Sequence, residues 1–207
     1  MPTAVRRTQA ERSAATQAKL LDAALGCLVE LGYAGTTTIV VAERAGVSRG
    51  AQLHHFPTRA ALVAAAVEHL YAQLTEAYQT AFARVPRGAD RLRAAIELLW
   101  SMFTEPRYAT VLELFTAART DAELRAHVRP IAERHQANVY RLARRYFPEA
   151  AHGRGLDDAL TLVLDAMQGM ASTRAVHEHG PTAAARLAAL HRLVAPTLAP
   201  PRGRRVA

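Results

Sequence analysis

The residues best suited to read a nucleic acid lie in one short stretch of this 207-residue chain. Gly46 can adopt the backbone angles of a tight turn between two helices, and Ser48 can cap the helix that follows. Arg49, next in the chain, carries a planar guanidinium group that matches the O6 and N7 atoms of guanine. The small side chains of Ala42 and Ala45 allow the two helices to cross closely. The pattern predicts a helix-turn-helix whose second helix enters the major groove of DNA.

Further candidates for contacts with DNA surround this turn. The amide of Gln52 either reads adenine or faces the protein interior, and the side chain of Leu53 matches the methyl group of thymine. Thr37 and Thr38, at the start of the helix before the turn, and Arg59, after the helix that follows the turn, suit phosphate groups instead. Such contacts position the protein on DNA without reading the base sequence. The predicted DNA-binding residues are Thr37, Thr38, Ser48, Arg49, Gly50, Gln52, Leu53, His54, His55 and Arg59.

No motif typical of an enzyme accompanies these residues. The sequence has no Gly-x-Ser-x-Gly, no phosphate-binding loop and no Glu-x-x-His pair with a carboxylate cluster. His177 and His179 are two positions apart, so they do not share a helix face and are poor partners for one metal ion. The single cysteine, Cys27, excludes an internal disulfide and a Cys-rich zinc site. We therefore expect no catalytic activity, no metal ion and no cofactor.

The charge of the chain agrees with an anionic partner without identifying one. Lys and Arg number 26 against 18 Asp and Glu, which gives a formal net charge of +8. Much of the excess lies at the two ends, in residues 1–60 and 198–207. No apolar run approaches the roughly 18 residues of a membrane span, and no signal-peptide stretch follows the N-terminal arginines. A cytoplasmic location without membrane contact is the expectation.

Apolar periodicity predicts an all-α fold of about nine helices. Alanine and arginine, which are frequent here, are good helix formers. The expected helices span 13–31, 37–45, 49–55, 57–84, 89–104, 107–118, 121–146, 156–178 and 182–195. The expected organisation is a basic N-terminal arm (1–12), a three-helix DNA-binding domain (13–60), a ligand-binding and dimerisation domain (61–197) and a disordered basic tail (198–207).

Three segments together resemble the N-terminal domain of TetR-type (TetR/AcrR) transcriptional regulators. They run from Gly32 to Thr38, from Val41 to Gly50 and from His54 to Pro57, and the resemblance covers about residues 13–63. The family often has Thr-Leu-Tyr where this chain has Ala51-Gln52-Leu53, so a phosphate-binding tyrosine hydroxyl is absent. The resemblance implies an all-helical homodimeric repressor that binds a palindromic operator and is released by a small-molecule effector. It also implies DNA contacts at Thr38, Arg49, Gly50, Leu53, His55 and Arg59.

Aromatic residues of the C-terminal domain are candidates to line a site for a hydrophobic effector. An aromatic side chain at helical spacing fits an ordinary core equally well, so both interpretations stay open here. We expect effector binding between the fourth and eighth helices to move the fourth, which carries the DNA-binding helices. The predicted ligand-binding residues are Trp100, Phe103, Phe115 and Tyr140.

The helix expected at 156–178 is apolar over more of its surface than a monomer should expose. Pairing this helix and the last helix with the same two helices of a second copy makes a four-helix bundle. In such a dimer the two DNA-reading helices (49–55) lie about 35 Å apart, which is about one turn of DNA. The predicted dimer-interface residues are Leu160, Val163, Met167 and Leu190.

Two other functions remain as alternatives at this point. One is a helical-bundle enzyme that uses the histidines, which metal analysis of the purified protein tests. The other is a basic helical adaptor that binds a protein or a membrane without reading DNA. Such an adaptor does not bind a specific operator, whereas the affinity of a DNA-binding regulator for its operator falls steeply as the salt concentration rises.

Overall fold

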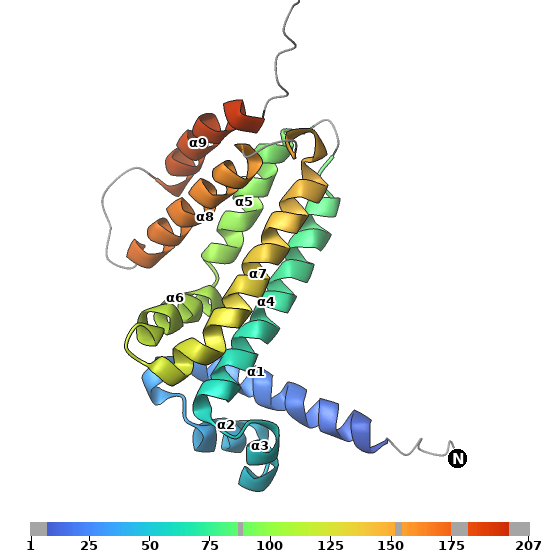
Figure 1. Ribbon diagram of the computed structural model, residues 1–207, viewed down its shortest axis with the longest axis vertical. Coiled ribbons are helices and arrows are strands. Elements are labelled where there is room, and N and C mark those ends of the chain that lie inside the picture. Colours follow the sequence, from blue (N-terminus) through green and yellow to red (C-terminus); the bar gives the residue numbers. More distant parts are fainter. Residues whose placement is uncertain (1–7, 87–88, 152–154, 175–181, 199–207) are drawn as a thin grey trace, which may run out of the picture. The chain divides into compact units, whose positions relative to one another are not determined.

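The computed structural model describes residues 8–86, 89–151, 155–174 and 182–198. His177 and His179, the tail from residue 199 and the arm before Thr8 lie outside these ranges. Within them every regular element is helical, which confirms the all-α prediction, and none of their helices is long and apolar enough to cross a membrane. The α-helices are α1 (Gln9–Gly35), α2 (Thr38–Ala45), α3 (Arg49–His55), α4 (Arg59–Ala83), α5 (Arg91–Phe103), α6 (Pro106–Ala118), α7 (Ala122–Tyr146), α8 (Gly155–Thr173) and α9 (Ala183–Val194) (Figure 1).

The first helix begins earlier and ends later than predicted. Thr8 and Glu11 form a capping box, so the helix starts at Gln9 although its first turns are exposed. Gly32, the predicted end, has φ of 67° and bends the chain, and one further turn then runs to Gly35. The bend therefore separates a long straight helix from a short C-terminal turn that carries Tyr33.

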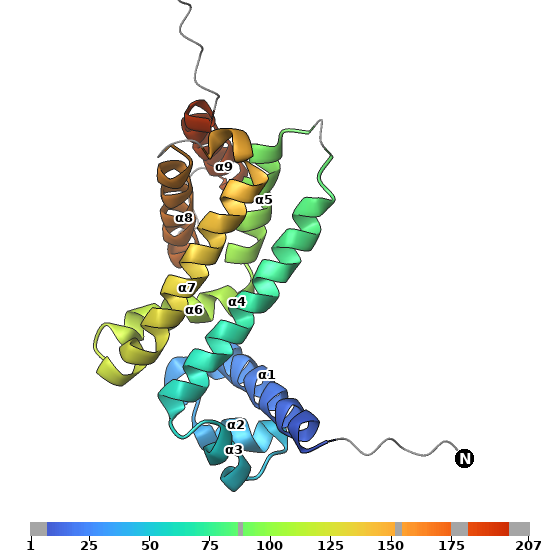
Figure 2. The ribbon, with the colours of Figure 1, turned by 45° about the vertical axis from the view of Figure 1, so that its right-hand side comes forward.

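One compact unit combines the beginning of the chain, Met1–Ala72, with the later segment Thr110–Ala132. In it α1 packs on α2 and α2 packs on α3 (Figures 1 and 2). The first half of α4, most of α6 and the start of α7 complete the unit. Its fully buried side chains include Leu20, Leu28, Val41, Leu62, Val67, Leu114 and Leu124.

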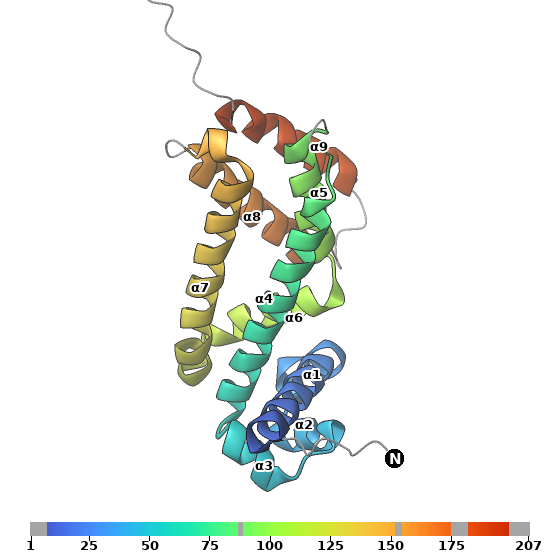
Figure 3. The same cartoon turned by 90° about the vertical axis from the view of Figure 1, so that its right-hand side faces the viewer.

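A second compact unit consists of Gln73–Ala109 and Glu133–Ala207. In it α8 and α9 lie against α5, as the turned views show (Figures 2 and 3). Its core contains Ile96, Phe103, Ala159, Val163, Met167, Leu187, Leu190 and Val194. The chain passes from one unit to the other three times, each time inside a helix, so the compact units do not divide at the predicted boundary after residue 60.

Candidate nucleic-acid interface

The turn between α2 and α3 has the geometry of a helix-turn-helix. Thr37 caps α2, since its hydroxyl accepts a hydrogen bond from the Val40 amide at 3.2 Å. Gly46 ends α2 in the left-handed conformation (φ 63°, ψ 36°), and its amide donates to the Glu43 carbonyl at 3.1 Å. Ser48 then caps α3 by accepting from the Ala51 amide at 3.2 Å. Local sequence alone therefore determines how α3 starts.

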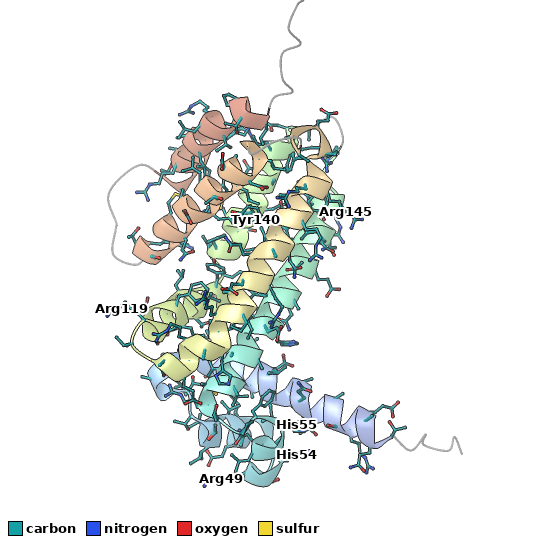
Figure 4. The ribbon with its side chains drawn as sticks, in the orientation of Figure 1. Arg49, His54, His55, Arg119, Tyr140 and Arg145 are labelled. Atoms are coloured by element: carbon teal, nitrogen blue, oxygen red, sulfur yellow. The ribbon has the colours of Figure 1, made fainter. Side chains whose placement is uncertain are left out.

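The outer face of α3 presents four residues to solvent. They are Arg49, Gly50, Leu53 and His54, whose spacing places them on one side of the helix; Figure 4 labels Arg49 and His54 on α3. Leu53 is 44% exposed, so its side chain is available for contact with an apolar group such as a thymine methyl. The half-buried ring of His55 lies 5.6 Å from that of His54, edge to face. This face therefore carries the positive charge of Arg49, the apolar side chain of Leu53 and the imidazole of His54, and Gly50 adds no side chain to it.

The prediction that Gln52 reads adenine is wrong for this structure. Its side chain is fully buried on the inner face of α3, and its Nε2 donates to the Phe56 carbonyl at 2.7 Å. Gln52 occupies a core position one helical turn before the buried Phe56, so its amide serves the end of α3 rather than a base. Its Oε1 is one of two buried side-chain atoms without a hydrogen-bond partner among the residues that the structure describes.

Arg59 has a partner inside the protein in this structure, and its contact with a phosphate stays a prediction. Its guanidinium donates to the Tyr33 carbonyl and lies 4.0 Å from the centre of the Tyr33 ring. The bend at Gly32 leaves both that carbonyl and that ring face available at the end of α1. Arg59 therefore joins the start of α4 to the end of α1.

Tyr33 has further partners that could not be predicted from the sequence. Its hydroxyl donates to Asp121 Oδ2 at 2.9 Å, and its amide donates to Glu113 Oε1 at 2.7 Å. Partial burial and then the bond to Asp121 raise the pKa of the Tyr33 phenol. The Leu124 amide, and then the Tyr33 hydroxyl, lower the pKa of Asp121. These partners are 80 and 88 residues away, so no local pattern could reveal them.

Arg44 of α2 contacts two residues of α1. The Arg44 guanidinium forms an ion pair with Glu30, and one of its nitrogens lies 4.0 Å from the buried Cys27 sulfur. Arg44 is exposed, yet both ends of its guanidinium are engaged by the Glu30 carboxylate. The pair favours one orientation of α2, and through it of the turn that leads to α3.

The four predicted effector-binding residues are divided between the two compact units. Phe103 is buried in the core of the second unit, where its ring lies 4.3 Å from that of Tyr108, and the half-buried Trp100 packs against the same core. Tyr140 hydrogen-bonds through its hydroxyl to Thr161 of α8. Phe115, half-buried on α6, belongs to the first unit. The role of these residues in binding a ligand stays a prediction.

Three of the four predicted dimer-interface residues are corrected by the structure. Val163, Met167 and Leu190 are buried against α5 within the chain, so they are not available to a second copy. The fourth, Leu160, is half-buried. The exposed apolar side chains of α8 and α9 are instead Leu162, 50% exposed, and Leu193, 67% exposed. Since α8 is apolar on several sides, periodicity alone could not tell its inner face from its outer face.

The described residues contain no group of three or more His, Cys, Asp or Glu side chains that could hold a metal ion.

Known proteins resemble the chain in sequence and in fold. The pattern of the family described as "Bacterial regulatory proteins, tetR family" matches residues 20–66. The HTH-type transcriptional regulator CymR of Pseudomonas putida is 38% identical over 171 residues, which cover 80% of this chain and 82% of the relative. The HTH-type transcriptional regulator Rv2912c of Mycobacterium tuberculosis is 33% identical over 138 residues, or 67% of this chain and 71% of the relative.

Two solved structures share the fold at low sequence identity. The multidrug binding protein EbrR, complexed with imidazole, gives a TM-score of 0.67 at 19% identity, over 91% of this chain and 97% of EbrR. A TetR-family transcriptional regulator from Rhodococcus sp. gives a TM-score of 0.66 at 15% identity, over 90% of this chain and all of the regulator. At these identities the likeness concerns the fold alone.

Proposed function

Because the chain belongs to the TetR family of bacterial transcriptional regulators, we propose that it binds a palindromic operator as a homodimer and acts as a repressor. A hydrophobic small molecule releases it from DNA, and the cytoplasm is where it works. The family is a class of DNA-binding regulators and not of enzymes, so the enzyme alternative is set aside. The adaptor alternative is set aside as well, because the relatives are named as helix-turn-helix regulators.

The observation that carries the proposal is the exposed face of α3 behind the left-handed turn at Gly46. In the proposed complex Arg49 pairs with guanine and Leu53 contacts a thymine methyl, while Gly50 allows the backbone to come close. His54 and His55 approach the edge of the groove. The hydroxyls and amides of Thr37, Thr38 and Ser48 position the two helices on phosphate groups. Gln52, which is fully buried, takes no direct part.

The proposed dimer forms through the outer faces of α8 and α9, where Leu162 and Leu193 are exposed. An exposed leucine on each of two neighbouring helices is the apolar surface that a symmetric four-helix bundle buries. The two copies of α3 then lie about 35 Å apart, so the operator has two half-sites one helical turn from each other.

The proposed effector site lies in the second compact unit, near Trp100 and Tyr140. Both side chains are half-buried on neighbours of α8 and combine aromatic surface with a hydrogen-bonding group, as sites for small hydrophobic ligands do. EbrR, which shares the fold, is named as a multidrug binding protein. Release requires that the ligand bind the DNA-free conformation more tightly than the DNA-bound one. Titrating a protein–operator complex with aromatic and aliphatic small molecules, with DNA release and melting temperature as readouts, tests this step.

The proposal as a whole is tested by selecting duplexes from a random DNA pool with the purified full chain. The expected product is an inverted repeat with half-sites about one turn apart. Binding to it weakens steeply as salt rises, because the released counterions contribute to affinity. A pool without an enriched inverted repeat, or binding with equal affinity to every duplex, contradicts the proposal.

A further inference from the structure

Tyr33 uses its hydroxyl, its amide, its carbonyl and its ring in contacts with three other segments of the first unit. The hydroxyl reaches Asp121 in the corner between α6 and α7, and the amide reaches Glu113 of α6. The carbonyl and the ring hold Arg59 at the start of α4. Figure 1 shows this corner beside the C-terminal end of α1. One residue thus joins the helix that supports α2 and α3 to both α4 and α6.

The α6 contact depends on a close approach at the preceding residue. A Cβ atom on Gly32 would lie 3.0 Å from a Glu113 carboxylate oxygen, besides being strained at φ of 67°. The glycine therefore lets the Glu113 carboxylate come directly onto the bend. Two carboxylates that accept hydrogen bonds at 2.7 and 2.9 Å fix the direction of this bend more firmly than apolar contacts do.

The α6 helix connects the contacts of Tyr33 to the second compact unit. The α6 helix begins in the second compact unit, at Pro106–Ala109, and continues into the first. A change that shifts or tilts α6 therefore moves Glu113 and the corner at Asp121. Because Tyr33 binds both of these groups, the end of α1 follows, and α2 packs on α1.

We propose that Tyr33, held by Asp121 and Glu113, is the positioning residue that couples the α6–α7 corner to DNA binding. The inference rests on the proposed binding of operator DNA, and it names the residues that couple the α6–α7 corner to that binding. Coupling between two sites is reciprocal, so operator binding at α3 must stabilise the corner as much as the corner favours operator binding. The corner can therefore be probed with DNA alone, without knowledge of the effector.

The experiment measures amide hydrogen exchange of the full chain with and without the duplex obtained by selection. Tyr33→Phe removes only the hydroxyl and keeps the ring for Arg59. Asp121→Ser is the second variant, because serine still caps α7 at the Leu124 amide but is too short to reach Tyr33. Tyr108→Phe, in the second unit, is the matched control for loss of a tyrosine hydroxyl.

In the wild type and in Tyr108→Phe, DNA is expected to slow exchange both at α3 and in residues 113–124. In Tyr33→Phe and Asp121→Ser the slowing at α3 persists, the slowing at 113–124 is reduced because only the bond from the Tyr33 amide to Glu113 remains, and operator affinity falls about five- to tenfold. A merely structural role lowers stability without uncoupling the two regions. Wild-type protein that binds the duplex with no change at 113–124, or variants that keep the full change, overturns the inference while the proposed function stands. Failure of the wild type to bind any duplex instead refutes the proposed function.

Discussion

Gln52 points toward the protein, and this leaves the outer face of α3 to Arg49, Gly50, Leu53 and His54. Residue type and spacing were enough to predict the roles of Gly46 and Ser48, since a turn and a cap depend on neighbouring backbone. They were not enough for Gln52 and Arg59, whose directions depend on Phe56 and Tyr33.

Replacing Gln52 with methionine tests its assignment to the interior. Methionine has a similar length and fills the same buried space without an amide. We expect operator affinity and base preference to stay within about twofold of wild type, because a residue that reads a base contributes about 1–3 kcal/mol of discrimination. Competition binding against duplexes changed at each adenine measures this. A variant that no longer distinguishes one adenine position would restore Gln52 to the interface.

The burial of His135 on α7 is expected to make the free energy of unfolding depend on pH. Desolvation by burial lowers the pKa of this histidine from 6.5 to about 4. Between these values the unfolded chain binds a proton that the folded protein does not, so stability falls as the pH drops. From pH 7 to pH 5 the loss from this residue is at most about 2 kcal/mol.

His135→Gln should reduce this pH dependence, as measured by chemical denaturation at a series of pH values. The matched control is His54→Gln, which removes an exposed imidazole and leaves His135 in place. Equal slopes for wild type and His135→Gln would show that another group is responsible.

At the scale of elements, the helix bounds were largely predictable because caps and apolar periodicity are local properties. Thr37, Ser48 and the glycine at 46 place α2 and α3 as expected. The buried side of α8 was not predictable, since leucines, valine and methionines occur around much of the helix and only the packing of α5 and α9 selects the inner face.

Two substitutions at Ser48 separate the capping of α3 from its contact with DNA. Ser48→Ala removes the acceptor for the Ala51 amide and should lower stability by about 1 kcal/mol, with a loss of DNA affinity. Ser48→Asp keeps the cap and should preserve stability, yet its negative charge should weaken DNA binding more than alanine does. Thermal unfolding and operator titration measure the two effects. Stronger DNA binding by the aspartate variant would argue against phosphate groups beside this cap.

At the scale of the whole molecule, the exposed leucines of α8 and α9 determine the proposed assembly. The assembly through α8 and α9 stays a prediction, but the apolar pattern did not distinguish the buried positions from the exposed ones, because the two look alike in a helix that is apolar on several sides. Val163 and Met167 belong to the core of the chain, whereas Leu162 and Leu193 are exposed among the residues that the structure describes.

Leu162→Arg combined with Leu193→Arg should convert the dimer to a folded monomer. Both side chains are exposed, so each change should alter the stability of the monomer by only about 0.5 kcal/mol. Sedimentation velocity at several protein concentrations measures the assembly. Leu31→Arg, at a similarly exposed leucine of α1, is the control and should leave the dimer intact. A double variant that sediments as wild type would place the interface elsewhere.

The central claim, that α3 reads DNA through its exposed first turn, is tested most directly at Arg49. Wild type, Arg49→Ala and Arg145→Ala are compared on the selected duplex and on duplexes changed at each position of the half-site. Arg145 is the control because it is an exposed arginine of α7 in the second compact unit, outside the α6–α7 corner (Figure 4). We predict that Arg49→Ala alone loses about 1–3 kcal/mol of binding free energy and no longer distinguishes the base at one guanine position. Equal affinity and an unchanged base preference for Arg49→Ala would contradict the account.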